Sequence, residues 1–329
     1  MRSIKLLPVV LIVVMVLTLG LMISTPVAAV KGAYPGVNGK IVFSAPMNNR
    51  EVIFIMNADG TNIQQLTDGT KYDILPSWSP DGTKIAFGRA VQGFADSTIW
   101  VVDSDGSGLR QLTSGGYQTA PAWSPDGTKI MFDKRGSGSN DGIYVIDANG
   151  PTGPGTQLIA DGSSPSWSPD GTKIAFSTGD IKVADANTGA VIATLTSGSS
   201  PCWSPDGSKI VFSNIDGTIS VMNADGSGLT SLNVNGGEPN WSPDGAKIVF
   251  MTGRDSVLIM NADGSEVHDL TPTMPNAGDP DWQRLPAAPV GGFIEPVNKL
   301  AVFAPYLALF GIVSTIAVIA VTTWKKPKT

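Results

Sequence analysis

Short apolar segments alternate with turn-forming residues along most of the chain. A segment such as Lys84-Ile-Ala-Phe87 carries the β-branched and aromatic residues that are typical of strands buried between sheets. It follows Ser79-Pro-Asp-Gly82, in which proline suits the first central position of a turn and glycine the position that needs a positive φ. Asn57-Ala-Asp-Gly60 follows the apolar residues 53–56 in the same way. The pattern predicts β-hairpins.

One twelve-residue pattern, Pro76-Ser-Trp-Ser-Pro-Asp-Gly-Thr-Lys-Ile-Ala-Phe87, recurs along the chain. Four further copies occupy residues 121–132, 165–176, 201–212 and 239–250. A sixth copy is split, because residues 39–43 supply its second half and residues 280–282 its first half. Each copy is followed by a second hairpin pattern, so each repeat is predicted to contribute four strands.

The repeat carries one tryptophan, and successive tryptophans are 45, 44, 36, 38 and 41 residues apart. This spacing is the length of one four-stranded propeller blade, and a closed ring explains the split copy. We therefore predict an all-β fold, a six-bladed β-propeller over residues 37–284, closed by pairing of its N- and C-terminal strands. The tryptophans predicted to pack between blades are Trp78, Trp123, Trp167, Trp203, Trp241 and Trp282.

The N-terminal residues 1–29 have the pattern of a signal peptide. An apolar run over residues 6–23 follows Arg2 and Lys5, and Val27 and Ala29 stand three and one residues before a plausible cleavage site. The run is also long enough for an uncleaved signal anchor, which is the alternative. Both alternatives export the residues that follow.

The C-terminal end predicts a membrane anchor. Residues 300–324 are uncharged and long enough to cross a bilayer of about 30 Å. Lys325, Lys326 and Lys328 follow, and by the positive-inside rule they place residues 325–329 in the cytoplasm as a basic tail. Residues 285–299, rich in Pro and Gly, are predicted to be a stalk. The propeller is thus expected to be extracytoplasmic and anchored in the cytoplasmic membrane, with the lipid bilayer as a partner.

Charge and composition exclude several classes of function. Five of the 22 basic residues flank the terminal apolar segments, which leaves 17 basic against 28 acidic residues between them. So acidic a body argues against nucleic acid as a partner. The single cysteine, Cys202, cannot form an internal disulfide, and with the single histidine, His268, it cannot build a Cys/His metal cluster. No cofactor and no metal site are predicted.

Repeated acidic residues are expected to be structural. Asp103-Ser-Asp-Gly-Ser107 resembles the start of a calcium loop, but no Glu follows at the spacing that calcium needs, so a hairpin turn is expected. A carboxylate fixed in every turn could serve acid–base chemistry, but it is more simply explained as a cap for its own turn. The carboxylates concerned are Asp81, Asp126, Asp170, Asp206 and Asp244.

The repeat Pro-x-Trp-Ser-Pro-Asp-Gly-x-Lys-Ile-x-Phe resembles that of TolB-type, WD-like β-propellers, and the resemblance covers residues 39–283. It implies a six-bladed propeller closed by strands from both ends. The chain departs from TolB, a soluble periplasmic protein with an α/β domain before its propeller, so the lipoprotein partner in the Tol system is not carried over. The stalk, hydrophobic segment and terminal lysines are similar to anchors of archaeal surface proteins.

The sequence favours a binding protein over an enzyme. Prolyl-peptidase relatives carry a hydrolase domain after such a propeller, but here Gly-x-Ser-x-Gly occurs only in imperfect form at residues 136–140, and His268 is expected to face solvent. We predict a module of the cell envelope that binds a protein, peptide or glycan. The alternatives are an enzyme that acts on polysaccharide or peptide with carboxylates alone, and a purely architectural envelope component.

The predicted binding site lies where the connections between strands are longest. From the Phe of the repeat to the next strand the spacing is 10, 12 and 11 residues in the first three blades but 5, 7 and 7 in the others. These long connections should lie side by side on the rim opposite the regular turns, where loops on a rigid scaffold often carry recognition. The candidate ligand-binding residues there are Arg50, Tyr72, Arg89, Phe94, Tyr117, Lys134 and Arg135.

Overall fold

The computed structural model describes residues 37–90, 96–136, 141–253 and 256–285 of the 329-residue chain. The predicted signal segment, membrane helix and basic tail, and all but the first residue of the predicted stalk, lie outside these residues. In the described ranges, no helix has the length and apolar character needed to cross a membrane.

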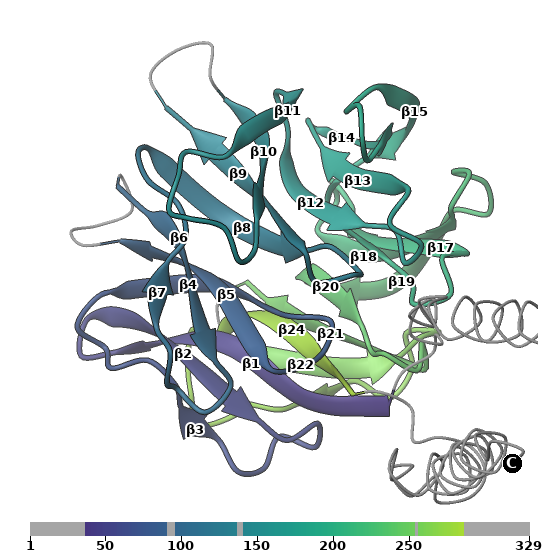
Figure 1. Ribbon diagram of the computed structural model, residues 1–329. Helices are drawn as coiled ribbons and strands as arrows, with labels where there is room; N and C mark the ends of the chain where they lie inside the picture. Colours follow the sequence, from purple (N-terminus) through teal and green to yellow (C-terminus); the bar gives the residue numbers. More distant parts are fainter. Residues whose placement is uncertain (1–36, 91–95, 137–140, 254–255, 286–329) are drawn as a thin grey trace, which may run out of the picture. The chain divides into compact units, whose positions relative to one another are not determined.

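Within the described residues, six four-stranded antiparallel sheets form the blades of a propeller (Figure 1). In each blade the strands are named here from the central channel outward. Blade 1 consists of β24 (Gly278–Leu285), β1 (Val37–Met47), β2 (Arg50–Met56) and β3 (Gln64–Gln65). Blade 2 consists of β4 (Tyr72–Trp78), β5 (Lys84–Ala90), β6 (Thr98–Asp103) and β7 (Arg110–Gln111). Blade 3 consists of β8 (Tyr117–Trp123), β9 (Lys129–Arg135), β10 (Gly142–Asp147) and β11 (Thr156–Ala160).

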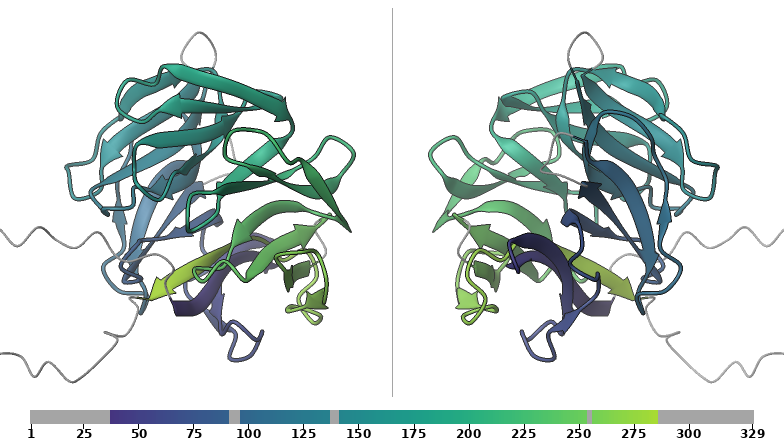
Figure 2. Two further views of the ribbon diagram at one scale, coloured as in Figure 1. Left: turned by 90° about the vertical axis from the view of Figure 1, so that its right-hand side faces the viewer. Right: turned by 90° about the vertical axis from the view of Figure 1, so that its left-hand side faces the viewer.

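The remaining three blades follow the same order around the ring (Figure 2). Blade 4 consists of β12 (Ser163–Trp167), β13 (Lys173–Ser177), β14 (Asp180–Asp185) and β15 (Val191–Ser197). Blade 5 consists of β16 (Ser199–Trp203), β17 (Lys209–Ser213), β18 (Thr218–Asn223) and β19 (Thr230–Asn235). Blade 6 consists of β20 (Gly237–Trp241), β21 (Lys247–Thr252), β22 (Ser256–Asn261) and β23 (His268–Asp269).

The ring closes within blade 1, where the last strand, β24, pairs with the first, β1. Trp282 lies opposite Ile41 in this ladder. The amide of Gln283 connects the closing strand to both neighbours: its Oε1 accepts a hydrogen bond from the Lys40 NH (3.0 Å), and its Nε2 donates to the carbonyl of Gly82 (2.8 Å). The predicted six-bladed ring and its closure by the two chain ends are confirmed.

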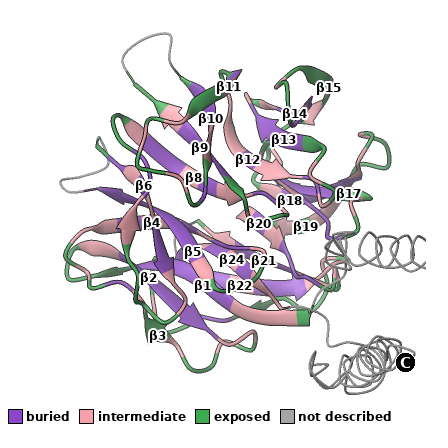
Figure 3. Ribbon diagram, in the orientation of Figure 1, coloured by how far each residue is buried: buried purple, intermediate pink, exposed green. Residues whose placement is uncertain are grey.

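The hydrophobic core is divided into clusters, each built from residues of two neighbouring blades. Figure 3 shows long buried stretches on the strands of the blades. Between blades 1 and 2, for example, Val42 and Ile53 meet Trp78 and Phe87. The interface of blades 6 and 1 is built in the same way, and there Val249 of blade 6 packs with Ile41 and Trp282 of blade 1. Each repeat therefore gains its stability from the next repeat, and the closing strand completes the last interface.

The repeated aspartates cap their own turns, as expected. Asp126 Oδ1 accepts hydrogen bonds from Ser124 Oγ (2.7 Å), the Thr128 NH (3.0 Å) and Thr128 Oγ1 (2.8 Å). The Ser124 hydroxyl and the Thr128 NH hold the pKa of Asp126 below its ordinary value. The same serine-to-aspartate bond recurs in the other complete copies, at Asp81, Asp170, Asp206 and Asp244.

The loop that resembled a calcium site is a hairpin turn between β6 and β7. The Asp103 NH donates to the Ser107 carbonyl (2.9 Å), the Gly106 NH donates back to Asp103 (2.9 Å), and the Asp103 carboxylate pairs with Lys84. No group of three or more His, Cys, Asp or Glu side chains in the described part of the chain is arranged to hold a metal ion.

Candidate functional site

The innermost strand of every blade bends at the proline that opens the repeat. The pairing register shifts at this point in all six sheets, which is the signature of a β-bulge. Proline suits a bulge because it has no NH to contribute to the ladder. The residue before it has a positive φ, which is uncommon for residues other than glycine. These six residues are Leu75, Ala120, Ser164, Ser200, Glu238 and Asp279.

The six residues before proline form a ring at one mouth of the central channel. All six inner strands run in the same direction, so this mouth lies on the rim of the long connections and not on the rim of the Ser-Pro-Asp-Gly turns. The channel holds a cavity of about 260 Å³. Sequence reasoning missed this ring, although a signal was present: the position before the repeated proline varies from copy to copy, whereas the proline itself and the tryptophan two residues after it do not.

Two carboxylates, Glu238 of blade 6 and Asp279 of blade 1, meet on this ring. Asp279 Oδ2 accepts hydrogen bonds from Ser44 Oγ (2.7 Å) and from the Leu75 NH (3.1 Å), so it joins blade 1 to blade 2. Burial, then the charge of Asp279 and a hydrogen bond with it, raise the pKa of Glu238 well above its ordinary value. Glu238 Oε2 is buried and has no hydrogen-bond partner among the described residues.

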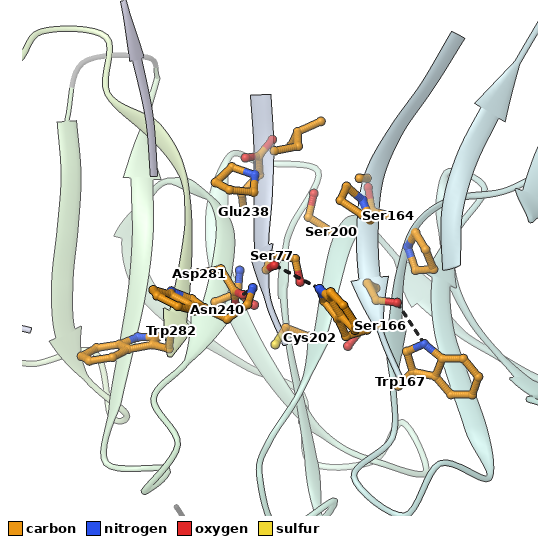
Figure 4. A pocket seen from close by; sticks show the side chains of 18 of the residues that line it. Ser77, Ser164, Ser166, Trp167, Ser200, Cys202, Glu238, Asn240, Asp281 and Trp282 are labelled. Atoms are coloured by element: carbon orange, nitrogen blue, oxygen red, sulfur yellow. Dashed lines mark hydrogen bonds between the residues drawn. The ribbon is translucent and has the colours of Figure 1, made fainter. Parts of the chain in front are cut away.

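A second level of side chains lies deeper in the channel, one residue after each proline (Figure 4). It consists of Ser77, Ala122, Ser166, Cys202, Asn240 and Asp281. Several of these side chains hold the next blade by accepting from the backbone of its tryptophan. Asp281 Oδ2 accepts from the Trp78 NH (2.7 Å), and Ser166 Oγ accepts from the Trp203 NH (3.3 Å).

Burial controls the titration of the deeper level. It raises the pKa of Cys202 to about 12, so the thiol stays protonated at neutral pH and is a poor nucleophile. It also raises the pKa of Asp281 to about 6, although the Trp78 and Trp282 NH groups and the charge of Arg284 act in the opposite direction. The deeper level is therefore suited to holding blades together.

The predicted ligand-binding residues that the structure describes lie on blades 1 to 3, on the rim that carries the channel mouth. Arg50 begins β2 and its guanidinium lies over the ring of Tyr72, which begins β4, at 4.4 Å from the ring centre. Tyr117 and Arg135 face each other across β8 and β9, and Lys134 Nζ lies 4.8 Å from the centre of the Tyr144 ring. Phe94 lies outside the described residues.

Arg89 differs from the other predicted residues because its charge is used inside blade 2. Its guanidinium makes two hydrogen bonds to Asp73, from Nε at 2.6 Å and from Nη2 at 2.8 Å. Both side chains are buried, 8% and 0% exposed. The sequence suggested an accessible basic side chain here, but the structure shows a buried ion pair. His268, on β23, is exposed, as expected.

The difference in connection length has a structural cause that the spacing alone did not show. In blade 1 the connection between β1 and β2 is a tight turn at Asn48 and Asn49, both with positive φ, so its additional residues extend the strands. In blades 2 and 3 the strands are also longer, and residues 91–95 and 137–140 of these connections lie outside the described part. Longer strands therefore account for the difference in blade 1 and for part of it in blades 2 and 3.

Fold and channel together define the class of this protein: a six-bladed β-propeller whose polar channel opens on its variable rim. A family model described as "TolB beta propeller domain" matches residues 161–284. The matched segment holds blades 4 to 6 and most of the closing strand, and blades 1 to 3 have the same four-stranded order.

Individual proteins match shorter stretches. The chain is 43% identical over 58 residues, 18% of its length, to the Tol-Pal system protein TolB of Rhizorhabdus wittichii. It is 31% identical over 83 residues, 23% of its length, to dipeptidyl-peptidase 5 of Porphyromonas endodontalis. These matches span only 13% and 12% of the two relatives. The solved structure of TolB from Acinetobacter baumannii shares the fold, with a TM-score of 0.65, 21% identity and coverage of 74% of this chain and 66% of that one.

Proposed function

We propose that this propeller is a recognition module of the cell envelope and that it binds an envelope protein or peptide on its variable rim. The observation that carries the proposal is the group of basic and aromatic residues on adjacent blades of this rim: Arg50, Tyr72, Tyr117, Lys134 and Arg135. The rest of the body is acidic, so this surface differs in charge from its surroundings. The relatives named TolB support an envelope protein as the class of partner.

The test compares two double variants that remove the same charge from opposite rims. Lys134→Ala/Arg135→Ala changes the variable rim, and Lys173→Ala/Lys209→Ala changes the residues that follow the Ser-Pro-Asp-Gly turns. Full-length protein would be immobilised and exposed to envelope extract of its source. We expect the first variant to lose captured protein about tenfold and the second to match the wild type. Equal capture by both variants, with unchanged melting temperatures, would contradict the proposal.

A glycan ligand is the alternative on the same surface, because Tyr72 and Tyr117 could stack on sugar rings. Treatment of the extract with protease before capture distinguishes the two ligands. Loss of all capture after protease supports a protein or peptide, whereas capture that survives protease and is removed by glycosidase supports a glycan.

An enzyme that uses carboxylates is the second candidate, because Glu238 and Asp279 converge at the channel mouth. A glycosidase pair needs two carboxyl groups that are about 5 Å or more apart and both free to act on the substrate. Asp279 also accepts from Ser44 and Leu75, so it serves the structure of the ring. We therefore favour binding over turnover. Hydrolysis of a peptide or polysaccharide library that disappears in Glu238→Gln would reverse this preference.

We further propose that the propeller stands outside the cytoplasmic membrane, tethered by residues 300–324, with residues 325–329 inside. The uncharged length of the segment and the lysines behind it support this topology. Protease added to intact cells should remove the propeller and spare a tag placed after Thr329. A protected propeller would reverse the orientation.

A further inference from the structure

One of the two acids at the channel mouth, Glu238, has a buried carboxyl oxygen without a hydrogen-bond donor in the described part of the chain. The ring offers six equivalent positions, but only Glu238 and Asp279, which are neighbours, carry acids; the other four carry Leu, Ala and Ser. Asp279 Oδ2 already accepts from Ser44 and Leu75. Glu238 Oε2 accepts from nothing among the described residues, although it is buried, and a buried acceptor without a donor destabilises the fold.

Burial, and after it the charge of Asp279, opposes ionisation of Glu238 and raises its pKa. A positively charged donor would both fill the vacant acceptor and relieve the repulsion between the two acids. Arg284 also lines the channel, but it acts on the deeper Asp281 and Cys202 and is not among the groups that perturb Glu238. The ligand that complements this pair is therefore a cation that can donate hydrogen bonds.

The channel walls indicate what such a cation is attached to. Glu238 lines the cavity together with the six prolines of the repeat, whose rings add apolar contacts to an otherwise polar wall: Pro76, Pro121, Pro165, Pro201, Pro239 and Pro280. Ser164 of blade 4 and Ser200 of blade 5 lie at the same level as Glu238 (Figure 4). Glu238 is half-buried and is one of the residues that line the cavity, so its side chain borders the space that a ligand would occupy.

We infer that the channel mouth binds a primary alkylammonium group, with its charged head on Glu238 and its aliphatic stem along the proline rings. The ammonium supplies the missing donor and the missing positive charge, and the stem fits a cavity of about 260 Å³. A divalent metal ion fits less well, because no third acidic, Cys or His ligand joins the pair among the described residues. This site lies on blades 6 and 1, apart from Lys134 and Arg135 on blade 3, so it does not depend on the function proposed above.

The test is a calorimetric titration of full-length protein with n-butylamine at neutral pH. We expect saturable binding by the wild type and none of n-butanol, which has the same stem without the charge. Glu238→Gln keeps the shape of the side chain and should weaken butylamine binding about tenfold or more. Glu266→Gln removes an exposed acid from the same blade and should bind as the wild type does.

A second measurement does not rely on a variant. In the wild type, the carboxyl carbon signal of Glu238 in an NMR spectrum should shift on addition of n-butylamine and stay in place with n-butanol. An unshifted signal, or equal binding by wild type and Glu238→Gln, would overturn the inference. So would binding of calcium that excludes butylamine. Stronger binding of a lysine-containing peptide than of putrescine assigns the ammonium to a protein side chain, and the reverse order assigns it to a free amine; either order supports the site.

Discussion

Two arginines of this protein show that residue type and position in the repeat do not by themselves predict whether a side chain is exposed. Arg89 and Arg135 carry the same charge and were predicted for the same surface, but Arg89 is paired with Asp73 inside blade 2 and Arg135 is exposed. The sequence held a weak signal for the pairing, because Asp73 and Arg89 occupy facing positions of neighbouring strands. Facing positions can be derived only when the register is known, and the bulge in β4 moves the register by one residue.

The ion pair predicts an unusual order of stabilities. Arg89→Ala leaves the Asp73 charge buried without a partner and should lower the free energy of unfolding by about 3 kcal/mol. Arg89→Ala combined with Asp73→Ala removes both charges and should be more stable than the single variant. Urea unfolding of the three proteins measures this order. A double variant less stable than Arg89→Ala would show that Asp73 stabilises the fold even without Arg89, which contradicts the expected order.

Asp133 predicts a dependence of stability on pH. Burial raises its pKa from 3.8 to about 7, against the opposing effects of the Ser164 NH and the charge of Arg135. Between about pH 4 and pH 7 the folded protein keeps a proton that the unfolded chain has lost, so the free energy of unfolding falls as pH rises. Asp281, with its pKa raised to about 6, acts with the same sign.

The corresponding variant is Asp133→Asn, which cannot ionise. Its melting temperature should decline less between pH 5 and pH 8 than that of the wild type, by several degrees. Asp161→Asn, an exposed position near the same interface, should decline as the wild type does. Identical pH profiles for Asp133→Asn and wild type would mean that Asp133 stays ionised in the fold.

At the scale of elements, the repeat predicted the strands well because each copy carries its own turn chemistry. Ser-Pro-Asp-Gly and Asn-Ala-Asp-Gly fix the hairpins locally, and the turn glycines Gly82 and Gly60 have the positive φ that was expected. The bulge at the inner strand was not predicted, because the proline that opens the repeat is compatible with a bulge but does not require one. The ring of residues before proline depends on this bulge and was missed with it.

Glycine also allows the short connections into the inner strands of blades 4 to 6. A Cβ on Gly198 would lie 2.6 Å from Phe212 and 2.8 Å from the Ser213 carbonyl oxygen, which is backbone and cannot move away. Gly198→Ala should therefore destabilise the fold by about 1–3 kcal/mol. Gly237 in the next blade meets only Ser213 Oγ, at 3.8 Å, so Gly237→Ala should stay within about 0.5 kcal/mol of the wild type. Equal effects in urea unfolding would contradict this packing.

At the scale of the whole ring, stability depends on closure. Six core clusters, each shared by two blades, are arranged in a cycle, and the cluster between blades 6 and 1 needs Trp282 from the closing strand. Closure was predictable from the split repeat alone, because two half-copies at opposite ends of the propeller complete one blade only if the ring closes. What the sequence did not show was the function of the ring's interior, which depends on which residues meet at one mouth.

Deletion of residues 279–283 should open the ring. Loss of β24 exposes the edge of β1 and half of the cluster at Trp282, so the melting temperature should fall by at least 10 °C and the protein should aggregate on heating. Gln283→Ala removes only the bonds to Lys40 and Gly82 and should fall between the deletion and the wild type. A deletion that melts like the wild type would refute the closed ring.

At the six residues with positive φ before proline, the backbone supplies the frame of the channel mouth and the side chains determine what the mouth presents. Their backbone is held by the bulge and the proline, which are the same in every blade, while their side chains vary from leucine to glutamate. Exchange of one of these side chains alters what the mouth presents without a change in the frame that holds it. Because the backbone frame is the same at all six positions, single substitutions there could give related propellers new ligands. A designer could change the specificity of the channel in the same way.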